Sequence, residues 1–396
     1  MTIWSYRRLA ALASLLVAAC IPSALPSAPM ANAKPEVTPS PAPLANATPA
    51  SLHEEIFSPL AAGPAPADQP LNVYASTMAT AVPVELAGIK PRVYVPDSLS
   101  NTVEVIDPET MKVVDRFATG SIPHHVAPAP DLSTLYVDNE GSSTLTQIDV
   151  HTGRPVRNIP VTYPYNLYFT LDGSKAVVVA ERLRRLEFWD AHDWKQLKIV
   201  DIPWPGADHL DFSADGKYLF VSTEYSGMLA RVNVETMQLE GSVSVGGLPV
   251  DVRLSPDGTV LYVANQGRQG VSVVDPQQMK EVAFIPTGQG AHGLQVSRDT
   301  TKLYVTNRLA GTISVIDFEK RAVVATWKIG GSPDMTQLSP DGKQLWVSSR
   351  FDAGVMVVDT GDGHLIARIP TGPGAHGLTY FPNVGSRSIG HNGVYR

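Results

Sequence analysis

The stretch Leu248–Gly288 reads LPVDVRLSPDGTVLYVANQGRQGVSVVDPQQMKEVAFIPTG and decides the fold of this chain. It holds four short runs of β-branched or alternating residues, and each break between them contains Gly, Pro, Asp or Asn. This pattern predicts four antiparallel strands joined by tight turns. A single meander of this size cannot bury both of its faces, so it must stack on further copies of itself.

Such copies recur along the chain. The opening of the unit returns at spacings of 41, 43 and then four times 42 residues. The openings begin at Pro123, Pro164, Ala207, Pro249, Ala291, Pro333 and Ala375. A regular period of this length with four strands per unit is typical of a β-propeller, in which each repeat forms one blade. We therefore predict an all-β fold, a seven-bladed β-propeller.

The two ends of the repeat region complement each other. The opening at Ala375 has little chain after it, while residues 91–120 form a repeat that lacks its first strand. The C-terminal inner strand is therefore expected to pair with the N-terminal blade and close the ring, which leaves no free sheet edge. The propeller is predicted to span residues 91–396.

The N-terminus has the features of an export signal. Residues 1–20 contain a short basic region ending in Arg7 and Arg8, and an apolar stretch follows at 9–19. This stretch is too short to cross a bilayer as a stable helix. We predict a signal peptide over 1–20 and an exported protein, periplasmic or at the cell surface.

Cys20 is the single cysteine of the chain, so the ring can contain neither a disulfide nor a catalytic thiol. The sequence VAAC at 17–20 resembles a bacterial lipoprotein signal, in which the cysteine is acylated. The alternative is an ordinary cleaved signal, for which a cut after residues 31–33 is available. We favour lipidation at Cys20, which would make the membrane a partner only through this lipid.

The next segments differ from the repeats in composition. Residues 21–70 are rich in Pro, Ala and Ser, which predicts a disordered tether. Residues 71–90 form a lead-in whose place the sequence leaves open. The net charge of −7 argues against nucleic acid as the main partner. A monomer is expected.

Several segments carry a family resemblance. LYVTN at 303–307 and GTISVID at 311–317 resemble the YVTN β-propeller repeat, and segments 164–188, 331–335 and 388–396 resemble exported YncE-like propellers. The resemblance implies a secreted or envelope-attached ring. Relatives are reported to bind DNA, to assist haem-cofactor assembly as NirF does, or to act as lactonases.

Histidines gather at the starts of the inner strands, where alternation directs polar residues toward the channel and its mouth. A ring of imidazoles with a thioether would suit copper or another late transition metal. The candidate ligands are His124, His125, His209, His292, His376 and Met335. The alternative is structural, with these imidazoles holding neighbouring strand ends by hydrogen bonds.

Arginines recur in the loops between second and third strands, which emerge on the same face as the channel mouth. Guanidinium groups suit carboxylates and phosphates, so we expect an anionic small molecule, glycan or protein segment there. The candidate binding residues are Arg182, Arg184, Arg185, Arg268, Arg308, Arg350, Tyr165 and Asn166. Single-stranded nucleic acid, stacked on aromatic residues, is a secondary candidate.

The sequence contains no nucleophile elbow, P-loop or dinucleotide fingerprint, and we predict no catalytic residue. A lactonase-like site could be argued from Asp208, His209 and Asp251. The favoured interpretation is a binding or interaction module in the cell envelope. The alternative is a metal- or cofactor-handling protein or an enzyme that uses the histidine-rich mouth.

Overall fold

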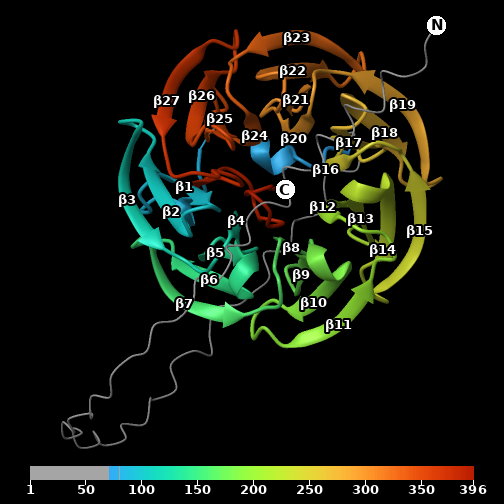
Figure 1. Cartoon of the computed structure of the whole chain (residues 1–396), viewed down its shortest axis with the longest axis horizontal. Coiled ribbons are helices and arrows are strands. Elements are labelled where there is room, and N and C mark those ends of the chain that lie inside the picture. The colour runs from blue at the N-terminus through green and yellow to red at the C-terminus, as the bar shows by residue number, and fades with distance from the viewer. Residues whose placement is uncertain (1–70, 80) are drawn as a thin grey trace, which may run out of the picture. The chain divides into compact units, whose positions relative to one another are not determined.

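The computed structural model describes residues 71–79 and 81–396, so the predicted signal peptide, the tether and Cys20 lie outside the described residues. Seven four-stranded antiparallel sheets surround a common axis (Figure 1). The predicted seven-bladed β-propeller is therefore confirmed. No helix among the described residues is long and apolar enough to cross a membrane.

The blades are numbered from the N-terminus, and blade 1 is β28-β1-β2-β3. The innermost strands of blades 1 to 7 are β28 (Thr379–Phe381), β4 (Pro123–Pro128), β8 (Asn166–Phe169), β12 (Ala207–Phe212), β16 (Pro249–Leu254), β20 (Ala291–Val296) and β24 (Pro333–Leu338). The second strands are β1 (Arg92–Asp97), β5 (Thr134–Asn139), β9 (Lys175–Ala180), β13 (Tyr218–Thr223), β17 (Leu261–Asn265), β21 (Lys302–Asn307) and β25 (Gln344–Ser349).

The third and fourth strands complete each blade toward the rim. The third strands are β2 (Thr102–Asp107), β6 (Thr144–Asp149), β10 (Arg185–Asp190), β14 (Met228–Asn233), β18 (Gly270–Asp275), β22 (Thr312–Asp317) and β26 (Gly354–Asp359). The fourth strands are β3 (Lys112–Ala118), β7 (Arg154–Pro160), β11 (Gln196–Asp201), β15 (Gln238–Ser244), β19 (Lys280–Pro286), β23 (Ala322–Lys328) and β27 (Leu365–Pro370). Short 3-10 helices are η1 (Ala75–Met78), η2 (Val84–Leu86), η3 (Glu140–Ser142), η4 (Glu181–Leu183) and η5 (Glu224–Ser226).

The ring closes as the sequence predicts. Strand β28, near the C-terminus, pairs antiparallel with β1, and Thr379 lies opposite Tyr94 while Phe381 lies opposite Arg92. Both Tyr94 and Phe381 are buried in one apolar cluster together with Val126 of blade 2. Closure therefore joins the last part of the chain to the first blade by both hydrogen bonds and packing.

The burial of the strands follows their composition. The second and third strands are packed between neighbouring blades, so nearly every residue of β9 and β17 is buried and their sequences are almost wholly apolar. The outermost strands face solvent, and β23 alternates exposed and partly buried residues. Apolar clusters lie between adjacent sheets, as where Phe188 of blade 3 packs with Leu219 of blade 4.

The aspartates of the turns have structural roles. In the turn after β16, the carboxylate of Asp257 accepts hydrogen bonds from the hydroxyl of Ser255 at 2.5 Å and from the backbone N–H of Thr259 at 3.0 Å. Gly258 supplies the positive φ of 71° that the turn needs. At the end of β18, Asp275 accepts the N–H groups of the two residues that begin the next turn.

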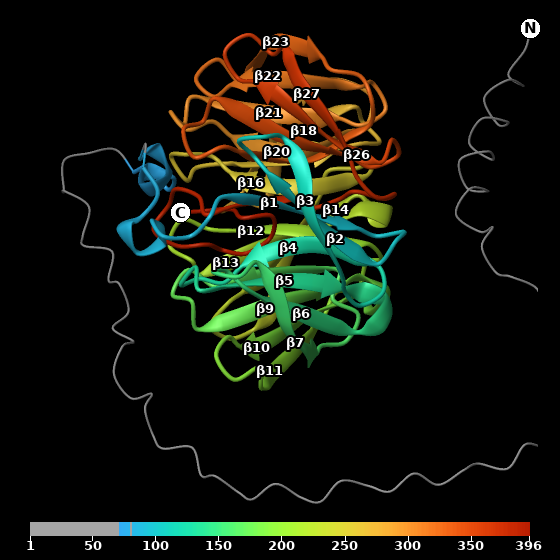
Figure 2. The same cartoon turned by 90° about the vertical axis from the view of Figure 1, so that its left-hand side faces the viewer.

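The ring has two distinct faces. We call the side with the connections between second and third strands, including η3, η4 and η5, the mouth face. The opposite side, with the turns between first and second strands, is the turn face. Residues 71–79 and 81–90 lie on the same side of the ring as the C-terminus (Figure 2). This is the turn face, because the N–H of Val73 donates to the carbonyl of Pro256 in the turn after β16.

The C-terminal tail, residues 382–396, plugs the turn-face end of the channel. The carbonyl of Ile389 accepts the N–H of Phe169, and the N–H of His391 donates to Leu167 at 2.7 Å. The guanidinium of Arg396 lies 2.5 Å from Asp211 at the end of β12. These contacts hold the tail to blades 3 and 4, and Gln337 of blade 7 donates to the carbonyl of Gly393 at 2.9 Å.

Replacing Phe381 by alanine should weaken closure, since its ring is 1% exposed between blades 1 and 2. We expect a loss of ~3–5 kcal/mol in the free energy of unfolding, measured by denaturant titration. Val156→Ala, at a residue that is 63% exposed on β7, is the control and should change stability little. A Phe381→Ala protein as stable as the control would contradict this account of closure.

Candidate metal and ligand site in the channel

A β-bulge at the start of the inner strand sets the geometry of the site. In blade 2, Pro123 pairs with Asn139 and Val126 with Val137, so His124 and His125 together face one residue of β5. The same irregularity occurs at the start of β12, β16, β20 and β24. A regular strand would send neighbouring side chains to opposite faces, whereas the bulge presents both to the channel.

Hydroxyl groups from the second strands stabilise these bulges. The hydroxyl of Ser222 lies 3.2 Å from the N–H of His209 and also donates to the carbonyl of Val250 in the next blade. The hydroxyl of Thr306 likewise accepts the N–H of Gly293 at 2.7 Å and donates to the backbone carbonyl of Asp334 in the next blade at 2.6 Å. Each hydroxyl therefore fixes one bulge and links it to the neighbouring inner strand.

Three buried histidines form what we call the tri-histidine cluster: His125 of β4, His209 of β12 and His391 of the tail. Their candidate ligand atoms lie within 4.8 Å of one another. The ring centroids of His125 and His209 are 5.2 Å apart, and His391 lies 5.0 Å from the first and 4.7 Å from the second. All three side chains are fully buried.

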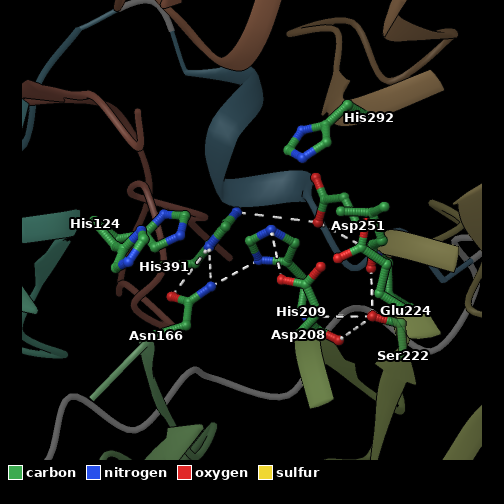
Figure 3. A network of polar contacts seen from close by, with 12 residues as sticks. His124, Asn166, Asp208, His209, Ser222, Glu224, Asp251, His292 and His391 are labelled. Carbon is green, nitrogen blue, oxygen red and sulfur yellow. Dashed lines mark hydrogen bonds and ion pairs between the residues drawn. The ribbon is translucent and has the colours of Figure 1, made fainter. Parts of the chain in front are cut away.

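Two amides orient the tri-histidine cluster. The Nδ1 of His125 lies 2.7 Å from the Oδ1 of Asn392, so Nδ1 carries the proton and Nε2 keeps its lone pair. The Nδ2 of Asn166 lies 2.7 Å from Nδ1 of His209 and 3.0 Å from Nδ1 of His391 (Figure 3). Within the described residues, Nε2 of His125 and of His209 have no hydrogen-bond partner, although Nε2 of His209 lies 3.3 Å from Oδ1 of Asp208. Nε2 of His391 lies 3.3 Å from Nδ2 of Asn392.

A second group, the Asp334 cluster, is already compensated by cations. The carboxylate of Asp334 accepts from Nε of Arg308 at 2.9 Å and lies 3.0 Å from Nδ1 of His292. Arg350 lies 3.8 Å away and Nε2 of His376 3.6 Å away. The guanidinium of Arg308 is the main cause that holds the pKa of Asp334 well below its usual range despite burial.

His124 connects the Asp334 cluster to the mouth. Its Nδ1 lies 3.3 Å from Nδ1 of His376, and its Nε2 lies 3.3 Å from the carboxylate of Glu140 in η3. Arg182 of η4 binds the same carboxylate through two hydrogen bonds of 2.8 and 2.9 Å. Tyr165 packs beside His124, with ring centroids 4.8 Å apart.

Burial keeps the channel imidazoles neutral at neutral pH. It lowers the pKa of His125 to about 3 and that of His292 to about 4, where Arg308 adds to the effect. It also lowers the pKa values of His209, His376 and His391 well below the ordinary value. Neutral imidazoles can offer lone pairs to a metal ion.

The carboxylates of the mouth show the opposite trend. Burial, followed by repulsion from Glu140 and Glu224, raises the pKa of Glu181 to about 7. Burial and the charges of Glu224 and Glu181 raise the pKa of Asp208 well above its usual range. At the mouth, blades 3 and 4 therefore hold more carboxyl groups than the nearby cationic side chains can neutralise.

The family model of the YNCE-like β-propeller matches residues 61–383. The chain belongs to the YNCE-like β-propeller family. This confirms the resemblance that the YVTN repeats indicate. No curated protein matches the chain.

Solved structures similar to this YNCE-like propeller share its fold at low identity. Hydrazine synthase of Kuenenia stuttgartiensis is 19% identical, with a TM-score of 0.57 over 64% of this chain and 87% of the other. Dihydro-heme d1 dehydrogenase NirN, in complex with DHE, is 16% identical with a TM-score of 0.58 over 76% and 77%. A putative 6-phosphogluconolactonase of Bacteroides uniformis is 17% identical with a TM-score of 0.62 over 74% and 99%.

The structure brings only some of the expected arginines to the mouth of this YNCE-like propeller. Arg182, Arg308 and Arg350 lie beside the channel, each close to a carboxylate of the protein. Arg185 instead binds Glu187 within β10. Arg268 binds the carbonyl of Val245 at 2.7 Å and the side chain of Glu281 at 2.6 Å, and lies 4.0 Å from the ring centre of Phe284.

Other expected site residues are placed as follows. Arg184 is exposed at the end of η4. Met335 is buried on β24, where its backbone N–H bonds to the hydroxyl of Ser348. Asp251 pairs with Arg253 and lies 4.0 Å from Nε2 of His391. His391 itself was not among the expected ligands, and the only signal for it was the tail segment that resembles relatives.

His292 allows a test of the buried, neutral imidazoles. Its pKa falls from 6.5 to about 4 on folding, so between these values the unfolded chain binds a proton that the folded chain does not. Stability should therefore fall as the pH is lowered through this window, by up to ~1.4 kcal/mol per pH unit from this residue.

His292→Gln should remove this contribution, as urea unfolding measured at several pH values would show. Exposed His151 provides the control variant His151→Gln, which should keep the wild-type slope. Equal slopes for wild type and His292→Gln would contradict the assignment.

Proposed function

We propose that this YNCE-like propeller is a non-catalytic binding module whose channel holds one late transition metal ion, copper(II) or zinc(II), at the tri-histidine cluster. The observation that carries the proposal is the convergence of His125, His209 and His391. Their ligand atoms lie within 4.8 Å of one another in a fully buried site. Three neutral imidazoles are a ligand set suited to zinc and copper.

His125 is already arranged as a metal ligand. Its Nδ1–H donates to Asn392, which leaves the unpartnered Nε2 as the electron-pair donor. Metal-bound histidines commonly donate the other ring N–H to a carbonyl or carboxylate, which fixes the tautomer. A buried nitrogen without a hydrogen bond is costly, and a metal ion would supply the missing partner.

Asn166 controls the other two ligands. Its Oδ1 accepts the N–H of Leu167 at 2.9 Å, so its Nδ2 faces Nδ1 of both His209 and His391. In this arrangement His209 carries its proton on Nε2, which lies 3.3 Å from Oδ1 of Asp208. Nε2 of His391 lies 3.3 Å from Nδ2 of Asn392 and accepts from it, so the proton of His391 is on Nδ1, 3.3 Å from Oδ1 of Asn166. A half-turn of the Asn166 amide would offer Oδ1 to an Nδ1–H of His209 and free the Nε2 lone pair of that imidazole. Asn166 is therefore a positioning residue whose amide selects between the two arrangements.

The Asp334 cluster is a weaker candidate for a metal. Asp334 is already bound by Arg308, and Arg350 lies nearby. A divalent cation placed there would meet the positive charge of both guanidinium groups. Because Arg182 and Arg308 are occupied by carboxylates of the protein, we also favour the cation over the anionic ligand that the arginines suggested from sequence.

Metal titration tests the proposal directly. Chelator-treated protein should bind one copper(II) or zinc(II) ion per chain, measured by calorimetry and elemental analysis. His391→Ala should lose this ion, since it removes one of the three imidazoles. His364→Ala is the matched control, because it disrupts the exposed group Asp359, Asp362 and His364 and should keep the channel ion. If neither the wild type nor His364→Ala binds a metal ion, the proposal is wrong.

A second arm of the same test changes affinity in the opposite direction. Asn166→Asp offers only acceptor oxygens, so it should hold Nδ1–H on His209 and His391 and release Nε2 for the metal. We expect binding to tighten by about tenfold or more. When the free metal concentration is a hundred times the dissociation constant, metal binding should also add ~2.7 kcal/mol to the free energy of unfolding. Weaker binding by Asn166→Asp at unchanged fold would count against the amide's role.

We further propose that the propeller works in the cell envelope, tethered by a lipid on Cys20. The support is the sequence of residues 1–20, with its basic start, apolar stretch and VAAC end. In a bacterial host, the wild type should incorporate labelled palmitate and sediment with membranes. Cys20→Ser should lose the label and move to the soluble fraction. Identical labelling and fractionation of both proteins would refute the anchor.

A further inference from the structure

The mouth face exposes apolar side chains at one repeated loop position. In four blades, the second residue of the connection between second and third strands is a large apolar or aromatic residue that lies open to solvent. These residues are Leu99 at 76% exposure, Tyr225 at 62%, Leu309 at 70% and Phe351 at 67%. Exposed apolar groups gathered on one face mark interaction surfaces in soluble proteins.

Three of these residues lie on consecutive blades and form what we call the apolar arc: Leu309 of blade 6, Phe351 of blade 7 and Leu99 of blade 1. The guanidinium of Arg308 lies 5.8 Å from the ring centre of Phe351, so the loops of blades 6 and 7 touch. The ring places this arc on one side of the channel mouth. Blades 3 and 4 form the other side.

The side opposite the apolar arc is acidic. Glu181 opens η4 of blade 3 and Glu224 opens η5 of blade 4, and both are half-buried. Glu224 accepts a hydrogen bond of 2.8 Å from Gln266, and Glu181 forms no ion pair within the described residues. Beneath them, Asp208 is 3% exposed, and its Oδ1 lies 3.3 Å from Nε2 of the neutral His209.

The charges of the mouth are unbalanced. Three guanidinium groups, those of Arg182, Arg308 and Arg350, bind Glu140 and Asp334. Glu181 and Glu224 form no ion pair within the described residues, and Asp208 lies only beside the neutral imidazole of His209. A positively charged group inserted between blades 3 and 4 would complement them. Tyr225, next to Glu224, offers an aromatic face to the same cation.

We propose that the mouth face docks a segment of a partner protein that covers the apolar arc and inserts a lysine or arginine side chain between Glu181 and Glu224. A small cation would use the carboxylates but leave the arc exposed. A second copy of this chain, docked face to face about a two-fold axis, would oppose two acidic sides or cover them without neutralising them. The inference does not depend on metal binding in the channel.

Peptide display tests this proposal with the whole protein. A random-peptide display library is panned on the wild type, and the enriched peptides are titrated against variants by fluorescence anisotropy. The acidic side is removed by Glu181→Gln/Glu224→Gln, and the apolar arc by Leu309→Ser/Phe351→Ser. The charge-matched control is Glu235→Gln/Glu240→Gln, at exposed residues of blade 4 away from the mouth.

We expect enriched peptides to combine a lysine or arginine with neighbouring apolar residues. Their affinity should fall at least about tenfold in each mouth variant, which is a loss of ~1.4 kcal/mol, and remain unchanged in the control. Added salt should weaken binding to the wild type. The proposal is overturned if no such peptides enrich, or if they bind the mouth variants as tightly as the wild type. It is also overturned if N-acetyl-lysine amide competes as well as the peptides, or if Leu309→Ser/Phe351→Ser converts a dimer into a monomer.

Discussion

The apolar faces of a single blade cannot be covered except by another blade, and this constraint underlies the whole structure. Each sheet is covered on both sides by its neighbours, so second strands such as β9 and β17 are buried along almost their whole length. Covering the last face requires the ring to close, which β28 and β1 achieve by pairing residues from the two ends of the propeller. The channel, its histidines and its mouth all depend on that closure.

Inside the ring, several buried carboxylates have specific charged partners. Asp334 is matched by two arginines and two histidines, and Glu140 by Arg182 and His124. Against this background, the unpartnered nitrogens of His125 and His209 stand out. Other buried atoms, such as the carboxylate oxygens of Asp97 and Asp138, also lack a hydrogen-bond partner within the described residues. At the tri-histidine cluster, however, the unpartnered nitrogens lie beside further imidazoles, so a bound metal ion could use several ligands at once.

The sequence was sufficient to predict the architecture because the repeat is regular. Strand alternation, the Pro-Asp-Gly turns and the incomplete first repeat led directly to seven blades and to the pairing of β28 with β1. The family followed from the YVTN repeats. The structural role of turn residues such as Asp257 was also readable, since local hydrogen bonding determines it.

The candidate site was less accessible from sequence, for physical reasons. Strict alternation separates His124 from His125, and only the bulge brings both to the channel. Periodicity could not show that Arg185 and Arg268 find partners within the sheets, because those contacts depend on three-dimensional packing. His391 lies outside the repeat, so its place beside His125 follows only from the path of the tail.

The tail also determines when the tri-histidine cluster can exist. His125 and Asn392 touch although 267 residues separate them along the chain, and His124 and His376 are separated by 252. Contacts of such long range form late in folding, since the intervening chain must be ordered first. The proposed metal ligands would therefore come together only in a finished ring, and a partly folded chain would lack the complete site.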